Sequence, residues 1–550
     1  MAEQAGAGAK IVKDFHQILI WPLQLMSGPN GAHIQSHWEN LIPEGGASVW
    51  RELDDEFTDN PAEFQERHYR EFVSFLPHVQ RFLYGERASR GGRAGYGESP
   101  IRVYRRYDAR RVRLTFPDDP VPVELEIVHI DLYFFYDVDV TILALEVRAD
   151  NLPFERVQEI MHRFGRAYPA GWTESGAGAN CLEKAEWLDG DGNVLSVSDY
   201  ERRDKYLASV CTHQATAMAS HWEFLLQPMV LDQRDSAGLL RYRMLEYYRM
   251  PIMAYLAVDD PASLTRADWS RLAFAGAPGD DLPLATRFMH DFDQRYAYDR
   301  FYDPLRPEWT NTRLICSGHT FVAVGEAGKA LFTDKERGFL AQFRHQVFNL
   351  GLIAHFHRAA LLMLSDRLVT TVSRLDINSQ DAVSRFRRDI RITLEVFLRF
   401  THRYYFSEVS DQAMLRDLFR MWTSHLGTAK LYSELREEIQ DMSTYLETDM
   451  LRRQAVTILQ LTVATLFSLI GTVTTGFLGM NIFGLAEMPA LDRLLIFLAV
   501  FVPTTLLTLY TVMKSQRLAR FLDALANEKV PWKGKFKILT DVWRKRTPLN

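Results

Sequence analysis

Residues 454–478 read QAVTILQLTVATLFSLIGTVTTGFL, and residues 494–513 read LLIFLAVFVPTTLLTLYTVM. These runs of 25 and 20 residues contain no charged side chain. About 20 residues of helix cross the hydrocarbon core of a bilayer, so each run is long enough to span one. Pro503 lies inside the second run, and neighbouring helices in a membrane can satisfy the carbonyl that a proline leaves free. The two runs predict two transmembrane helices near the C-terminus.

The flanking charges predict how these helices are oriented. Arg452 and Arg453 precede the first run, and the tail over residues 514–550 is rich in Lys and Arg. The segment between the runs, residues 479–493, carries Arg493 as its single cation. Positive charge stays on the cytoplasmic side. We therefore expect a multi-pass protein of the inner (plasma) membrane, with both termini in the cytoplasm and the connecting loop outside.

The composition limits the kinds of protein that the rest of the chain can be. The chain has 550 residues, a net charge of −6 and three cysteines. The charge argues against a nucleic-acid-binding protein, and an odd, widely spaced set of cysteines does not form a disulfide framework. No nucleophile elbow, H-E-x-x-H zinc motif or phosphate-binding loop occurs, so we do not expect an enzyme.

The N-terminal two thirds of the sequence predicts a mixed α/β head. Residues 121–135 and 139–147 are rich in β-branched residues and predict strands. Residues 152–168 predict an amphipathic helix. Residues 346–364 are almost long enough to span a membrane, but His355 and its charged neighbours lie at their centre. A cation there would cost about 2.5–3.5 kcal/mol in a bilayer, which favours a core helix.

From about residue 334 the pattern is helical. Candidate helices cover residues 334–374 and 380–406, and a third starts near Ser410, with Gly427 as a weak point. Residues 428–470 contain neither Pro nor Gly. A continuous helix over residues 428–479 would be about 75 Å long. Its first part carries a coiled-coil-like seam. The seam residues are Leu435, Ile439, Met442 and Leu446.

The first apolar run has one face that differs from the others. At 100° per residue, eight positions fall within a stripe of about 80° that mixes Thr and Gly with aliphatic residues. They are Gln454, Ile458, Leu461, Thr465, Leu469, Thr472, Gly476 and Gly479. Helix interfaces and water-filled pores use such residues, whereas lipid-facing surfaces do not need them. By itself the stripe fits ordinary helix packing as well as a pore.

The loop after the stripe resembles the CorA family of divalent-cation channels and transporters. Gly479-Met480-Asn481 matches the family's Gly-Met-Asn motif, which closes the first of two C-terminal spans. Residues 487–491, Glu-Met-Pro-Ala-Leu, partly match the Met-Pro-Glu-Leu that often follows, and residues 405–411 also resemble a family segment. The resemblance covers roughly residues 400–520. The head is longer than is usual in the family, and the proline that many relatives carry before the pore threonine is absent.

The resemblance implies a funnel-shaped homopentamer in which the first transmembrane helices line a central pore. Gly479, Met480 and Asn481 would form a selectivity filter at its outer mouth, with the Asn481 amide oxygens contacting a hydrated ion. Magnesium keeps several of its waters, and neutral amide oxygens can accept hydrogen bonds from them. Thr472 aligns with a pore hydroxyl of the family, and Ile458, Leu461 and Leu469 would form apolar constrictions. Glu487 and Asp492 would gather cations at the outer mouth.

These features give the predicted organisation of the chain: an α+β cytoplasmic head, a long helical stalk and two C-terminal transmembrane helices. The predicted parts are a head (1–375), a stalk (376–453), a pore-lining helix (454–478), an external loop (479–493), a second transmembrane helix (494–513) and a basic cytoplasmic tail (514–550). The expected partners are other copies of the chain, the bilayer and divalent cations.

The resemblance also implies metal ions that hold the pore shut between neighbouring heads. Asp441, Glu447 and Asp449 are candidate ligands, and no other cofactor is expected. The Asp189-Gly-Asp191-Gly-Asn193 stretch has the start of a calcium-binding loop but not its later ligands, so we interpret it as a hairpin turn. Magnesium influx is the first hypothesis, with cobalt or nickel as further ions. A zinc transporter like ZntB, perhaps proton-coupled, is the alternative. A membrane-anchored sensor or enzyme is the alternative of another class.

Overall fold

The fold is taken from a computed structural model of the chain. The structure describes residues 10–26, 34–42, 48–53, 65–85, 100–234, 240–246, 248–279, 285–306, 311–375, 380–480 and 489–513. The chain divides into two compact units, Met1–Gln440 and Asp441–Asn550. The predicted stalk, residues 376–453, is therefore divided between the two units, and most of it belongs to the first.

The first unit is built on one large, mostly antiparallel sheet. In the described residues its central path has the strand order β12-β13-β14-β11-β1-β6-β5-β4-β7-β8, with shorter strands attached to β1 and β5. The two parallel pairs are β11 with β14 and β9 with β10. The strands are β1 (Ile11–Leu25), β2 (Trp50–Glu52), β3 (Ile101–Arg106), β4 (Arg111–Phe116), β5 (Asp119–Phe135), β6 (Val140–Pro153), β7 (Lys184–Leu188), β8 (Val194–Val197), β9 (Val230–Leu231), β10 (Arg241–Met244), β11 (Ile252–Val258), β12 (Ala297–Phe301), β13 (Thr312–Cys316) and β14 (Thr320–Glu326).

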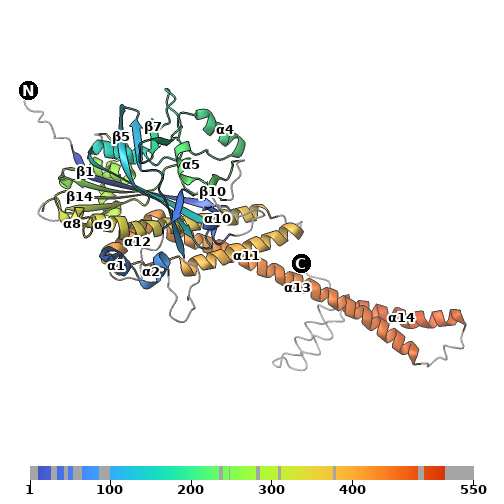
Figure 1. The fold of residues 1–550 in the computed structure, drawn as a ribbon. Coiled ribbons are helices and arrows are strands. Elements are labelled where there is room, and N and C mark those ends of the chain that lie inside the picture. Colours follow the sequence, from blue (N-terminus) through green and yellow to red (C-terminus); the bar gives the residue numbers. More distant parts are fainter. Residues whose placement is uncertain are drawn as a thin grey trace, which may run out of the picture. The chain divides into compact units, whose positions relative to one another are not determined.

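Helices cover both faces of this sheet (Figure 1). The helices of the whole described chain, in both units, are α1 (Glu66–Val73), α2 (Pro77–Tyr84), α3 (Phe154–Arg163), α4 (Arg203–His213), α5 (Ser220–Leu226), α6 (Arg266–Phe274), α7 (Thr286–Tyr296), α8 (Ala330–Thr333), α9 (Phe339–Gln342), α10 (Phe348–Ser373), α11 (Gln380–Arg403), α12 (Ala413–Leu426), α13 (Thr428–Gly479) and α14 (Ala490–Met513). Short 3₁₀ turns lie at His37–Asn40 and Pro261–Ser263.

The alternation of side chains along β1 explains why both faces are covered. Phe15, Leu19 and Trp21 join the main hydrophobic core. Their neighbours His16 and Gln24 point to the opposite face, because successive side chains of a strand alternate. Gln24 donates a hydrogen bond to Asp366 of α10 there. The central strands are therefore buried from both sides.

The apolar segment around His355 is a core helix, as predicted. The continuous helical stretch Phe339–Ser373 is apolar enough to span a membrane, but 89% of its apolar window is buried inside the structure. The stretch was predicted to start at residue 334. It starts instead at Phe339, and a π-helical turn, Phe343–Val347, precedes α10. His355 and His357 are both buried in this core.

Most other sequence predictions in this unit are confirmed, with changed ends. Residues 121–135 lie in β5, residues 140–147 lie in β6, and the predicted helix over 152–168 is the shorter α3. The helix predicted to start near Ser410 ends at Gly427, whose φ of +67° is left-handed, so α12 and α13 are separate helices.

Gly351 allows α10 and α12 to approach each other closely. A methyl group at Gly351 would lie 2.7 Å from Cη2 of Trp422. Trp422 is fixed because its indole N–H donates to the Gly318 carbonyl at 2.9 Å. We therefore expect Gly351→Ala to lower the free energy of unfolding by about 1–3 kcal/mol, since overpacking forces neighbours apart.

Thermal unfolding of the full chain, followed by tryptophan fluorescence, measures this effect. Gly190→Ala is the matched control, because nothing lies within 4 Å of an added methyl group there. An equal change of melting temperature in both variants would show that the contact with Trp422 does not limit the packing.

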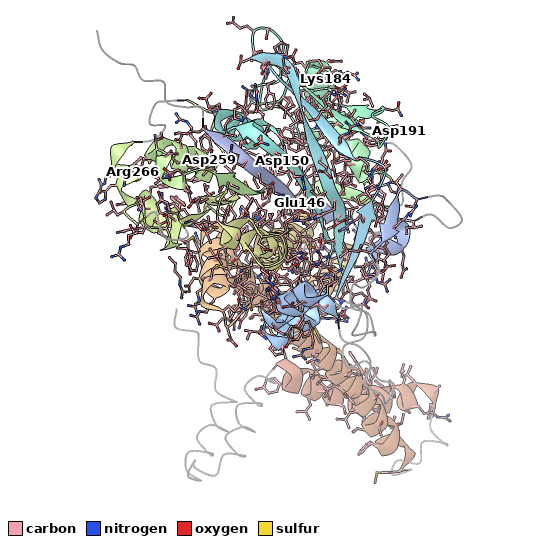
Figure 2. All side chains as sticks on the ribbon, turned by 60° about the vertical axis from the view of Figure 1, so that its left-hand side comes forward. Glu146, Asp150, Lys184, Asp191, Asp259 and Arg266 are labelled. Atoms are coloured by element: carbon pink, nitrogen blue, oxygen red, sulfur yellow. The ribbon has the colours of Figure 1, made fainter. Side chains whose placement is uncertain are left out.

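The second unit contains the end of α13 and α14. Figures 1 and 2 both show these two helices side by side. The apolar segments in them are Thr465–Gly479 and Ala490–Thr508, and none of the window in the latter is buried. The first is shorter than the predicted span over 454–478, and several side chains between residues 452 and 464 lie outside the described part. Both segments are apolar helices near the C-terminus, and Ala490–Thr508 is long and apolar enough to cross a membrane.

Candidate functional site

The predicted stripe on α13 is exposed along its whole length. Ile458, Leu461 and Leu469 are 63%, 64% and 53% exposed. The remaining stripe residues are also exposed, namely Gln454, Thr465, Thr472, Gly476 and Gly479. Apolar side chains exposed to this degree along one helix face are expected where lipid or another protein chain covers them.

The face of α13 that is buried within the chain lies on the other side of the helix. Ile470 and Thr474 are only 6% and 2% exposed. At 100° per residue, the centre of the stripe lies roughly 180° around the helix from these two residues. The packing within one chain therefore uses the face opposite the stripe and leaves the stripe free for contacts outside the chain.

Thr465 and Thr472 of the stripe donate their hydroxyl protons to backbone carbonyls of α13. Thr472 donates a hydrogen bond to the Ser468 carbonyl at 2.9 Å, and Thr465 donates to the Leu461 carbonyl at 2.5 Å. Bonding to the carbonyl four residues back is how threonine satisfies its proton in a helix. The oxygen lone pairs then remain available as acceptors. Thr472 therefore presents an acceptor oxygen, to which a water molecule of a hydrated cation could donate a hydrogen bond.

The glycines of the stripe leave space beside the helix. A methyl group built at Gly476 or Gly479 would meet nothing within 4 Å, and the same is true of Gly471. At Gly351 in the head, by contrast, Trp422 of the neighbouring helix fills that space. Packing within the chain does not require small residues at these positions.

The loop that follows the stripe is described in part. Gly479 ends α13, and Met480 is 65% exposed. Asn481 and Glu487 lie outside the described residues. Asp492 is in the first turn of α14 and is exposed. A negative side chain is favoured at that end of a helix, which gives Asp492 a structural role as well.

Of the three candidate metal ligands of the stalk, the structure describes the side chains of two. Asp441 and Glu447 are exposed, and the side chain of Asp449 lies outside the described part. In the part of the chain that the structure describes, no group of three His, Cys, Asp or Glu side chains is placed to hold a metal ion. The Asp189 stretch forms the turn between β7 and β8, as predicted, and Asp189 accepts hydrogen bonds from the Asp191 and Asn193 backbone.

A buried charged cluster in the head was not predicted. Its centre is Glu146 of β6, which is fully buried and lies inside the first unit (Figure 2). One carboxylate oxygen of Glu146 is 2.8 Å from Nδ1 of His16 and accepts a hydrogen bond from Nε of Arg344 at 2.7 Å. The other oxygen is 2.9 Å from Nε2 of His129. One carboxylate thus has three cationic or titratable partners from β1, β5 and the π-helical turn.

The cluster continues along the sheet on both sides of Glu146. His16 also contacts Asp14, with Nε2 3.3 Å from the carboxylate. His129 contacts Asp131, which accepts two hydrogen bonds of 2.7 Å from Arg105 of β3. The result is a row of alternating charges across four strands. A buried charge costs free energy unless it is paired, and here each charge has partners.

The cluster shifts the pKa values of its members. Burial alone would lower the pKa of His16 and of His129. The carboxylates of Asp14 and Glu146 outweigh burial at His16, and those of Asp131 and Glu146 do so at His129, so both pKa values are raised above 6.5. Burial would raise the pKa of Glu146, but His129, His16 and Arg344 hold it well below its usual value.

The sequence contains one signal for this cluster. Glu146 is the only charged residue in the strand VTILALEV, residues 140–147. An acidic residue inside a run that is buried on both faces needs a partner. The identity of the partners could not be predicted, because two of them, His16 and Arg344, are 130 and 198 positions away in the sequence.

Comparisons with protein-family models, with curated proteins and with solved structures found no match to this chain. The functional argument therefore depends on the residues and their geometry.

Proposed function

We propose that the chain is a subunit of a divalent-cation channel or transporter in the inner (plasma) membrane, with Mg²⁺ influx as its main activity. The observation that carries this proposal is the exposed stripe of α13, opposite the buried face, leading directly to Gly479-Met480-Asn481. A second apolar helix, α14, follows the loop. A polar filter motif between two apolar helices is typical of a pore entrance rather than of a simple anchor.

In this proposal, copies of the chain assemble as a homopentamer with the stripes facing a common axis. Open space at Gly476 and Gly479 supports this arrangement, because neighbouring helices can approach there. The Thr472 oxygen faces the axis and accepts hydrogen bonds from the water shell of the ion. Leu461 and Leu469 form apolar constrictions that can exclude water when the helices close.

The driving force needs no nucleotide in this proposal. A doubly charged ion moving inward gains about 4.6 kcal/mol per 100 mV of membrane potential, negative inside. The Arg- and Lys-rich tail and the head lie in the cytoplasm, and the loop containing Asn481 lies outside. Glu487 and Asp492 concentrate cations at that outer mouth.

Reconstitution of the full chain into liposomes loaded with a magnesium indicator tests the proposal. With an imposed inside-negative potential, we expect Mg²⁺ uptake that empty liposomes do not show. Thr472→Val should reduce uptake at least about fivefold, because it removes from each subunit an acceptor worth about 1 kcal/mol and leaves the side-chain volume almost unchanged. Thr474→Val, on the buried opposite face, is the matched control and should leave uptake unchanged.

Two outcomes would redirect the proposal. Zinc uptake that depends on a pH gradient, with no Mg²⁺ uptake, would favour a proton-coupled zinc transporter. Absence of uptake for Mg²⁺, Co²⁺, Ni²⁺ and Zn²⁺ alike, in a protein shown to be folded and oligomeric, would reject ion transport. The head would then be the functional part.

A further inference from the structure

The charged cluster around Glu146 connects the sheet to the helical layer. Arg344, which contacts Glu146, belongs to the π-helical turn Phe343–Val347. The next residue, His345, lies 3.2 Å from the carboxylate of Glu71 in α1. That carboxylate also accepts hydrogen bonds from Tyr84 and from Asn349 in the first turn of α10. Two carboxylates thus bind neighbouring residues of the turn: Glu146 binds Arg344, and Glu71 binds His345.

A π-helical turn is a strained insertion in a helix and is common at functional sites. Here it is fixed by the ion pairs of Arg344 and His345 rather than by ideal helical bonding. Weakening the bond to Glu146 would therefore loosen the beginning of α10. The two histidines set the strength of that bond, because in their protonated form they compete with Arg344 for the Glu146 carboxylate.

The far part of α10 is connected to the start of α13. Arg358 of α10 forms an ion pair with Glu246 and donates a hydrogen bond to the carbonyl of Leu426. Leu426 is the last residue of α12, and α13 begins at Thr428, two residues later. A movement of α10 would therefore pull on Leu426 and so shift the start of α13 at Thr428. All of these residues belong to the first unit.

We propose that His16, His129 and Glu146 form a pH-responsive lock that fixes the π-helical turn, and that the pH on the side of the head thereby regulates transport. The proposal rests on the proposed function for its effect on transport. The lock itself is a property of the head and can be measured without any ion flux.

The charged groups around the lock act on its histidines in both directions. Asp14, Asp131 and Glu146 favour protonated histidines from β1, β5 and β6. Arg105 of β3 opposes protonation of His129. Tyr255 of β11 packs its ring edge to face on His16 and stays neutral, because burial raises its pKa.

The sign of the effect follows from the histidines. A histidine whose pKa is raised in the folded state stabilises that state fully below pH 6.5, and this contribution is lost as the pH rises through the raised value. Above that pH, Glu146 stays ionised but keeps Arg344 as its remaining cationic partner among these three. That remaining contact is stronger, because no histidine charge then competes with Arg344 for the carboxylate. The lock on the turn is therefore closed at alkaline pH and loosened at acidic pH.

Hydrogen–deuterium exchange of the full chain in liposomes tests the lock directly. After correction for intrinsic rates, we expect protection of residues 343–347 to increase as the pH rises from 6 toward 9. Each unit by which the loss of the Arg344 contact raises a histidine pKa changes the opening equilibrium by up to about tenfold. In the double variant His16→Gln, His129→Gln the protection should be independent of pH. His290→Gln is the control, because His290 is 86% exposed and far from the cluster in sequence.

Mg²⁺ uptake at different internal pH values is measured on the same liposomes. Uptake that changes over the same pH range, and loses this dependence in the double variant, supports regulation. Protection that depends on pH while uptake does not would reject the regulatory role and leave the proposed function intact. Protection that is independent of pH in the unmodified chain would reject the lock. If the double variant does not fold, Arg344→Gln, at a partly exposed position, should remove the pH dependence instead.

Discussion

Asn481→Ala is expected to reduce Mg²⁺ uptake more than about tenfold while leaving the amount of folded, oligomeric protein unchanged. In the proposed pentamer the substitution removes five amide oxygens from one ring. A single neutral hydrogen bond is worth about 1 kcal/mol, so the loss of several at one ion position exceeds the 1.4 kcal/mol that corresponds to a factor of ten. Flux into indicator-loaded liposomes measures the effect.

Two controls separate the filter from general damage to the loop. Leu485→Ala shortens a side chain in the same loop without removing a polar atom, and uptake should remain close to that of the unmodified chain. Chemical cross-linking should give the same oligomer for all three proteins. Undiminished uptake in Asn481→Ala would reject the filter assignment, whereas equal loss in both variants would indicate that the loop's shape matters rather than its amide.

Glu146→Leu is expected to destabilise the head by about 3–5 kcal/mol. The substitution leaves His16, His129 and Arg344 facing each other without their shared carboxylate, and removal of one partner from a buried ion cluster has a cost of this size. The loss should be largest at acidic pH, where both histidines are charged. Thermal unfolding of the full chain at pH 6 and pH 9 measures both the loss and its direction.

Glu124→Leu is the matched control for this prediction. Glu124 also has two arginine partners, Arg111 and Arg113, but its side chain is 36% exposed. An exposed pair is worth about 1 kcal/mol or less, so the control should change stability little. A loss of similar size in both variants would mean that the burial of Glu146 does not decide the strength of its contacts.

The sequence predicted the parts of the fold that local pattern determines. Long uncharged runs, the uninterrupted helix of α13 and the apolar strands β5 and β6 all have local signals. The position of the helix around His355 was also predictable, because charges at its centre are incompatible with a bilayer. Helix ends were less accurate, since Gly427 and the π-helical turn depend on packing with other elements.

The head's internal organisation could not be predicted from the sequence in the same way. The partners of Glu146 come from β1, β5 and the π-helical turn, and only the three-dimensional pairing brings them together. The stripe on α13 was recognisable by helical phase. The position of the stripe opposite the buried face could be seen only from the structure, in which Ile470 and Thr474 are buried.

The central position of β1 has a consequence for how the chain is made. Residues 11–25 leave the ribosome before their two long neighbours in the sheet, β6 and β11, whose residues Glu146 and Met253 both pair with Ile18. At about 5–20 residues per second, the first strand waits on the order of tens of seconds for its second neighbour. During that time it offers an apolar edge to chaperones. The apolar helices of the second unit are synthesised after all the described strands of the head. The order of synthesis therefore favours folding of the head before membrane insertion.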